Sequence, residues 1–153
     1  MMYANDMAVD APRAARTGTG LASALAVAVN RLSRRLRQER DSDLTATQLS
    51  ALGTLRGHGP LTAGALAMHE RVQPPSMTRT VNCLVEAGTV RREPHPTDGR
   101  QVVLHLSEQG AALLAAERRR RDAWLTQRLR ALTPEQRDLL RRAAPVLEEL
   151  ARG

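Results

Sequence analysis

Residues 74–88 carry polar side chains at helical spacing. Pro74 and Pro75 suit the first turn of a helix, and Gly88 suits its C-terminal end. When successive residues advance by about 100°, one side of this helix is apolar and the opposite side is polar. The apolar side holds Met77, Val81 and Leu84, and the polar side with its flanks holds Pro75, Ser76, Thr78, Arg79, Asn82, Cys83 and Glu86. The pattern predicts a helix with one buried and one exposed side.

The exposed side has the side chains that recognise base edges. An arginine such as Arg79 can donate two hydrogen bonds to guanine O6 and N7, and Asn82 can pair with adenine. Ser76 and Thr78 can reach bases or phosphates, and the N-terminus of the helix directs backbone N–H groups at phosphates. A surface helix with an ordinary polar side has the same composition, so this helix alone leaves both interpretations open.

A second set of candidate residues lies on a predicted hairpin. Residues 89–93 and 101–106 have the composition of strands, and the turn-forming residues 94–100 join them. Arg92 lies on the entering strand, and the tip reads Asp98-Gly99-Arg100. An arginine on a rigid hairpin can enter a narrow minor groove. Asp98 would repel phosphates, so we interpret it as the partner that holds the Arg100 guanidinium.

The elements that position these residues form a recognisable order. Helices are predicted over residues 20–39, 45–56, 62–70 and 74–88, then the two strands, then helices over 107–132 and 133–150. Thr45 with Gln48 and Thr133 with Gln136 read as capping boxes. Short helices separated by a tight turn and followed by a hairpin are typical of a winged helix-turn-helix. The expected fold is mainly α with a small β-hairpin wing.

The amino-acid composition is compatible with a DNA-binding protein, but it does not by itself indicate one. The net charge is +7 and every basic residue is arginine, which favours a polyanionic partner but also fits a genome-wide codon bias. The single cysteine, Cys83, excludes an internal disulfide and fits a reducing compartment. No segment has the roughly 20 apolar residues of a membrane span, so we expect a cytoplasmic protein with no membrane partner. Residues 1–20 are expected to be a disordered tail.

Two motifs together resemble the MarR (multiple antibiotic resistance regulator) family of bacterial repressors, over about residues 21–150. In the wing, Asp98-Gly99-Arg100 is followed by Val102, Leu104, Leu106, Ser107 and Gly110. In the reading helix, the matching residues are Ser76, Thr78, Arg79, Val81, Leu84 and Gly88. Two residues depart from the family pattern: Cys83 stands where many relatives have a basic residue, and Thr89 where an aliphatic one is usual.

The resemblance implies specific roles. Ser76, Thr78, Arg79 and Asn82 would line the major groove, while Arg100, supported by Asp98, would enter the minor groove. The first and last helices, with part of the fifth, would form the interface of a homodimer. Family members often bind small phenolic or lipophilic effectors between that interface and the DNA-reading part.

The resulting hypothesis is a sequence-specific repressor that binds a palindromic operator on double-stranded DNA as a homodimer, with release by a small effector. It is expected to be no enzyme and to need no cofactor or metal. Residues 21–153 would form one domain, with the winged helix-turn-helix at about 44–106 and dimerisation helices at about 21–40 and 107–150. The expected DNA-binding residues are Gln73, Pro75, Ser76, Thr78, Arg79, Asn82, Arg92, Asp98 and Arg100.

Other interpretations are weaker. An architectural DNA- or RNA-binding protein needs no effector, but the near absence of aromatic residues argues against single-stranded targets. Cys83 could sense oxidants, and the four scattered histidines could meet at a metal. The run 118–121 could bind nucleic acid, although a solvated, salt-bridged surface with pairs Glu117–Arg121 and Arg118–Asp122 is favoured. No phosphate loop, nucleophile motif or carboxylate pair indicates an enzyme.

Overall fold

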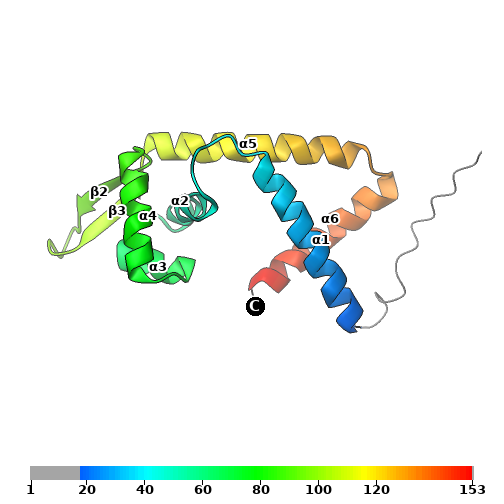
Figure 1. Cartoon of the computed structure of the whole chain (residues 1–153), viewed down its shortest axis with the longest axis horizontal. Coiled ribbons are helices and arrows are strands. Elements are labelled where there is room, and N and C mark those ends of the chain that lie inside the picture. The colour runs from blue at the N-terminus through cyan, green and yellow to red at the C-terminus, as the bar shows by residue number, and fades with distance from the viewer. Residues whose placement is uncertain (1–17, 153) are drawn as a thin grey trace, which may run out of the picture. The chain divides into compact units, whose positions relative to one another are not determined.

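A computed structural model of the protein describes residues 18–152. Their order is the one expected from the sequence, with a short additional strand, and Figure 1 shows it along the chain. The elements are α1 (Gly18–Gln38), α2 (Ala46–His58), β1 (Leu61–Thr62), α3 (Ala63–Glu70), α4 (Pro74–Glu86), β2 (Val90–Pro94), β3 (Val102–Leu106), α5 (Glu108–Arg130) and α6 (Pro134–Arg152).

The chain divides into two compact units, one ending at Gln38 and the other beginning at Glu39. The first unit contributes α1, and the second contains every other element. The expected single domain over residues 21–153 therefore stays a prediction. Of the expected N-terminal tail, residues 1–17 lie outside the described residues, and residues 18–20 belong to α1.

The predicted helix starts are confirmed by their hydrogen bonds. Thr45 Oγ1 accepts from the Gln48 N–H, and the Gln48 side chain accepts from the Thr45 N–H. Thr133 and Gln136 make the same reciprocal pair at the start of α6. Beside it, the backbone N–H of Glu135 and the Thr133 hydroxyl hold the pKa of the Glu135 carboxyl below its ordinary value. Local sequence is thus enough to begin these helices.

The strands form a three-stranded antiparallel sheet in the order β1-β3-β2. In β2 and β3, Val90 is opposite Leu106 and Pro94 is opposite Val102, as in the expected hairpin. Strand β1 was not predicted: Leu61 pairs with Leu104 and Thr62 with Val103. Two residues are too few to show an alternating pattern, and Thr62 also caps α3. The hairpin tip projects beyond α2, α3 and α4 (Figure 1).

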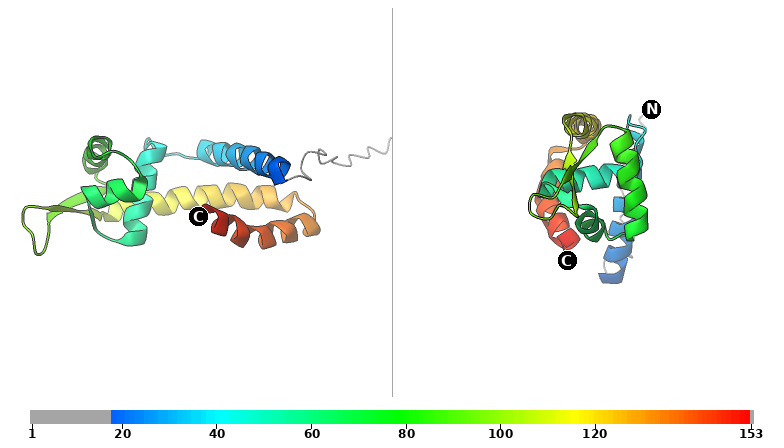
Figure 2. Two further views of the ribbon diagram at one scale, coloured as in Figure 1. Left: turned by 90° about the horizontal axis from the view of Figure 1, so that it is seen from below. Right: turned by 90° about the vertical axis from the view of Figure 1, so that its left-hand side faces the viewer.

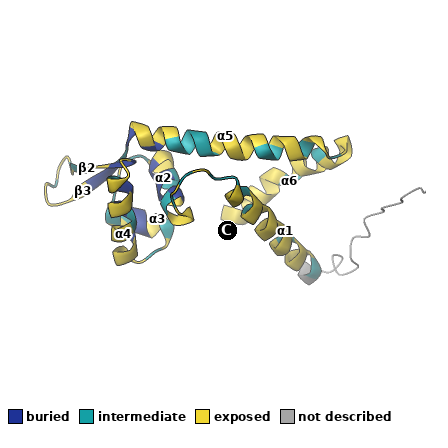
Figure 3. Cartoon of the chain, turned by 45° about the horizontal axis from the view of Figure 1, so that its top comes forward, coloured by how far each residue is buried: buried dark blue, intermediate teal, exposed yellow. Residues whose placement is uncertain are grey.

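The hydrophobic core lies within α2, α3, α4 and the sheet, which we call the central lobe (residues 44–106). Its fully buried side chains include Leu52, Leu66, Met77, Leu84 and Leu104. Burial on this scale stabilises a domain by about 2 kcal/mol for each large aliphatic side chain. Figure 3 shows the buried residues gathered in this lobe.

Helices α1 and α6 have the opposite character. Each is amphipathic, yet its apolar side is exposed (Figure 3). The exposed apolar residues are Leu21, Val27, Val29 and Leu32 in α1, and Leu139, Leu140, Val146, Leu147 and Leu150 in α6.

Helix α6 turns back from the far end of α5 (Figure 2). In that turn, the Arg137 guanidinium donates to the Leu132 carbonyl at 2.6 Å. Within residues 18–152, no helix has the length and apolar character needed to cross a membrane.

Candidate nucleic-acid interface

Helix α4 has the two sides that its sequence predicts. Met77, Val81 and Leu84 are at most 3% exposed and pack into the core. On the opposite side, the expected residues Pro75, Ser76, Thr78, Arg79, Asn82 and Cys83 are all exposed, as is Gln73 in the turn before the helix. The turn between α3 and α4 begins at Arg71, whose φ of 54° is left-handed. A non-glycine residue adopts this conformation at a cost of about 1 kcal/mol, and no sequence signal marked it.

The first turn of α4 is less suited to anions than we expected. Gln73 occupies the N-cap position without a side-chain capping bond. Pro74 and Pro75 follow and have no N–H, so Ser76 carries the first backbone donor inside the helix. Recognition by this helix must therefore depend more on side chains than on its N-terminus.

The side chains on the exposed face differ in what they can still bond. The Thr78 hydroxyl donates to the Pro74 carbonyl at 3.0 Å, so in this rotamer Thr78 offers DNA an acceptor and a methyl group rather than a donor for phosphate. Among residues 18–152, no partner pairs with the Arg79 guanidinium. All its donors are available for a base edge.

Asn82 and Arg92 are joined across two elements. The Nη2 atom of Arg92, on β2, donates to Oδ1 of Asn82, on α4, and both residues are exposed. Neighbouring Arg91 instead pairs with Glu93 on its own strand. The sequence placed Asn82 and Arg92 in the same interface but gave no sign of this bond.

The hairpin tip is held by backbone hydrogen bonds. Asp98 Oδ1 accepts from the Arg100 N–H at 3.1 Å, and the Asp98 carbonyl accepts from Gln101 at the same turn. We expected Asp98 to hold the guanidinium of Arg100; the bond in the structure goes to its backbone. His95 was not foreseen: its Nδ1 accepts from the N–H groups of Thr97 and Asp98, at 3.2 and 3.1 Å. These bonds fix the loop from which Arg100 projects.

The base of the hairpin is fixed to the start of α5. The Ser107 hydroxyl donates to the Gly88 carbonyl at 2.6 Å and accepts from the Gly110 N–H at 3.0 Å. A Cβ atom at Gly110 would overlap the carbonyl oxygen of Thr89. Thr89 itself is 1% exposed, and its hydroxyl donates to the Leu84 carbonyl. The buried Thr89 hydroxyl thus has a hydrogen-bond partner.

The histidines have structural partners. His58 and His69 stack with their ring centroids 4.1 Å apart, and His105 lies 3.2 Å from the Glu93 carboxylate. Over the described residues, no three His, Cys, Asp or Glu side chains gather as metal ligands. Cys83 is exposed on α4, among the side chains expected to face DNA.

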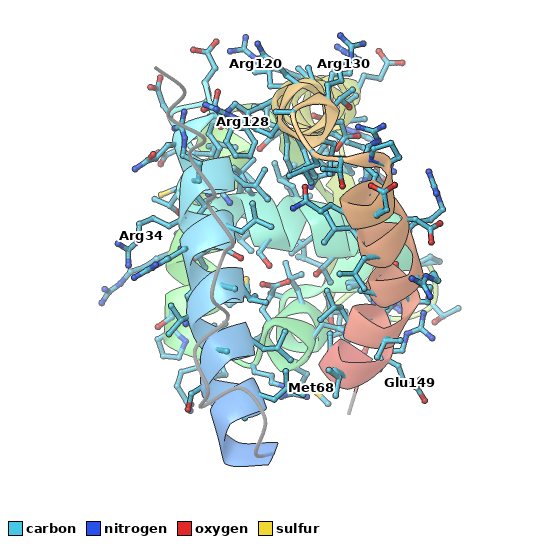
Figure 4. All side chains as sticks on the ribbon, turned by 90° about the vertical axis from the view of Figure 1, so that its right-hand side faces the viewer. Arg34, Met68, Arg120, Arg128, Arg130 and Glu149 are labelled. Atoms are coloured by element: carbon cyan, nitrogen blue, oxygen red, sulfur yellow. The ribbon has the colours of Figure 1, made fainter. Side chains whose placement is uncertain are left out.

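The arginine run on α5 is salt-bridged. Arg118 and Arg121 both pair with Asp122, and Arg120 pairs with Asp41 at 2.7 Å. The expected partner of Arg121, Glu117, instead accepts from the backbone N–H groups of residues 41 and 42. Figure 4 shows Arg120 and Arg130 pointing outward from α5. This surface fits the favoured interpretation of a solvated helix.

Comparisons with known proteins agree with this geometry. Residues 44–102 match the model of the MarR family. An HTH-type transcriptional regulator of Mycobacterium leprae is 52% identical over 131 residues, which cover 85% of this chain and 92% of the relative. The HTH-type transcriptional repressor NicR of Pseudomonas putida is 37% identical over 76 residues, which cover 50% of this chain and 48% of that protein.

The fold has a solved counterpart. The crystal structure of a transcriptional regulator from Pseudomonas aeruginosa superposes with a TM-score of 0.80 at 31% identity, covering 87% of this chain and 94% of that one. The prediction that the chain is no enzyme is confirmed by its relatives, which are regulators. The chain belongs to the MarR family of winged helix-turn-helix transcriptional regulators, and it is a DNA-binding protein.

Proposed function

We propose that the protein is a repressor that binds a palindromic operator as a homodimer. The observation that carries this proposal is the combination, on one lobe, of an exposed polar side of α4 and a rigid wing. On α4, Arg79 is exposed and available to bond a base edge. On the wing, Arg100 is exposed at the hairpin tip. A recognition helix in the major groove and an arginine in the adjacent minor groove give both base readout and affinity.

The homodimer is supported by the exposed apolar sides of α1 and α6. Leu150 is 66% exposed and Leu21 is 51% exposed, and exposed apolar stripes of this kind mark association surfaces. Two copies related by a two-fold axis would present two α4 helices to DNA. Such a dimer reads half-sites about 10 base pairs apart, centre to centre.

Repression is supported by the likeness to NicR, which is a repressor. Release by a small phenolic or lipophilic effector rests on the family resemblance alone. Titrating the protein–operator complex with salicylate and with decanoate would test it. Release of the operator by either compound supports an effector of that chemistry.

The experiment that tests DNA recognition is selection from a randomised duplex library. We expect an enriched inverted repeat, and the Arg79→Ala variant should bind it about 1–3 kcal/mol more weakly and lose preference at one position of each half-site. Arg119→Ala removes the same charge from an exposed position of α5 and is the matched control. If Arg79→Ala weakens binding equally on all sequences, Arg79 contacts phosphate and the assignment is wrong.

A further inference from the structure

The Asn82 side chain is held by a partner outside its own helix. A free asparagine amide can flip by 180°, which exchanges the positions of its oxygen and its NH₂ group. It can therefore present either an acceptor or a donor to the DNA. In this protein the Arg92 guanidinium donates to Asn82 Oδ1. Because arginine has only donors, this bond fixes which end of the amide is which.

We propose that Arg92 is a positioning residue that makes Asn82 read a guanine. This inference rests on the proposed readout by α4 and names the base that one of its residues selects. With Oδ1 directed at Arg92, the amide presents its NH₂ group to the groove. Guanine offers two acceptors there, N7 and O6, whereas the adenine edge includes the N6 donor, which would face the NH₂ group.

The usual pairing of asparagine with adenine is disfavoured by the same bond. That pairing needs Oδ1 to accept from adenine N6 while Nδ2 donates to N7. Here one of the two Oδ1 lone pairs already accepts a charge-assisted hydrogen bond, and this bond turns Oδ1 toward Arg92 on β2. The adenine preference suggested by the Asn82 side chain alone is therefore replaced by a preference that depends on a strand residue ten positions away.

Arg91 provides a matched control. It neighbours Arg92, is exposed like it and carries the same charge, but its guanidinium pairs with Glu93. Arg91→Ala and Arg92→Ala therefore remove equal charge from the same strand, and only the second frees the Asn82 amide. Any effect of charge alone on DNA binding should appear in both variants.

The experiment is selection from a randomised duplex library with full-length wild type, Asn82→Ala, Arg92→Ala, Arg91→Ala and the Asn82→Ala/Arg92→Ala double variant. We expect one position of each half-site to prefer guanine in the wild type. Asn82→Ala and Arg92→Ala should each reduce the discrimination between guanine and adenine at that position by about tenfold. The double variant should lose little more, because the pair acts as one unit. Arg91→Ala should keep the preference.

Three results overturn the inference alone. One is an adenine preference in the wild type at the position that Asn82→Ala affects. Another is retention of the guanine preference in Arg92→Ala with a uniform loss of affinity like that of Arg91→Ala. In both cases the regulator proposal stands. A third is an Asn82→Ala variant that changes no base preference, and here too the regulator proposal stands, because Arg79→Ala tests readout by α4 separately. If the wild type enriches no site, readout by α4 fails and the inference fails with it. Equal thermal melting of the variants, expected for exposed side chains, excludes misfolding.

Discussion

The central lobe and the terminal helices use apolar residues in opposite ways. In the central lobe, Leu52, Met77 and Leu84 are each 0% exposed. In α6, Leu139 and Val146 recur at the same helical spacing, yet they are 59% and 58% exposed. Helices α4 and α6 are both amphipathic, and only α4 has its apolar side covered within the described chain. An apolar stripe shows that a helix needs a partner, but does not show whether that partner belongs to the same chain.

The largest expected effect tests the terminal helices. Val146→Glu places a charge in the middle of the α6 stripe, and an unpaired charge in a dimer interface costs at least about 2 kcal/mol, roughly thirtyfold in Kd. Sedimentation equilibrium should show the shift toward monomer. The control, Arg141→Glu, introduces the same side chain on the opposite side of α6 and should stay dimeric. A Val146→Glu variant that dimerises like the wild type would show that the stripe is no interface.

A second prediction compares two glycines in helices of the second unit, Gly110 in α5 and Gly53 in α2. Gly110→Ala forces a methyl group against the Thr89 carbonyl, and overpacking of this kind costs about 1–3 kcal/mol. Gly53→Ala, in α2, meets no atom within 4 Å and should instead stabilise the protein by about 0.5–1 kcal/mol. Urea unfolding followed by circular dichroism measures both. Equal effects of the two substitutions would mean that α5 does not dock closely at Thr89.

The smallest effect concerns the wing. Asp98→Ala removes the acceptor for the Arg100 N–H, so the tip should loosen and DNA binding should weaken by about 1 kcal/mol, although the net charge rises. An Asp98→Ala/Arg100→Ala double variant should bind little more weakly than Arg100→Ala. Titrations at one salt concentration compare these variants, with Glu149→Ala in α6 as the control for charge. Tighter binding by Asp98→Ala would mean that Asp98 only repels DNA.

Much of the fold could be predicted because its signals are local. Capping residues such as Thr45 and Thr133 act within one helical turn, and the division of α4 into buried and exposed sides follows from spacing alone. What could not be predicted depends on contacts between distant residues. Strand β1 exists because residues 61–62 meet β3, and Glu117 finds the backbone of residues 41 and 42 instead of Arg121.

In the candidate site, too, features set by local sequence could be predicted, and features set by contacts between elements could not. The residue types on α4 and at the wing tip could be read from spacing, and they are exposed as expected. Their hydrogen bonds could not, because they depend on loop geometry and on neighbouring elements. The Asp98 bond goes to a backbone N–H, His95 closes the tip, and Arg92 reaches Asn82 across two elements.

The close contact between Gly110 and Thr89 couples the orientation of α5 to the backbone that follows α4. Helix α5 is 23 residues long, so it spans about 34 Å without a break. Because no space separates its first turn from the Thr89 backbone, the two cannot slide independently. A rotation of about 5° around that contact moves the far end of the helix by about 3 Å, given that length. A displacement of about 3 Å at the α6 end of α5 therefore reaches the Thr89 backbone, three residues beyond the end of α4, as a rotation of only about 5°.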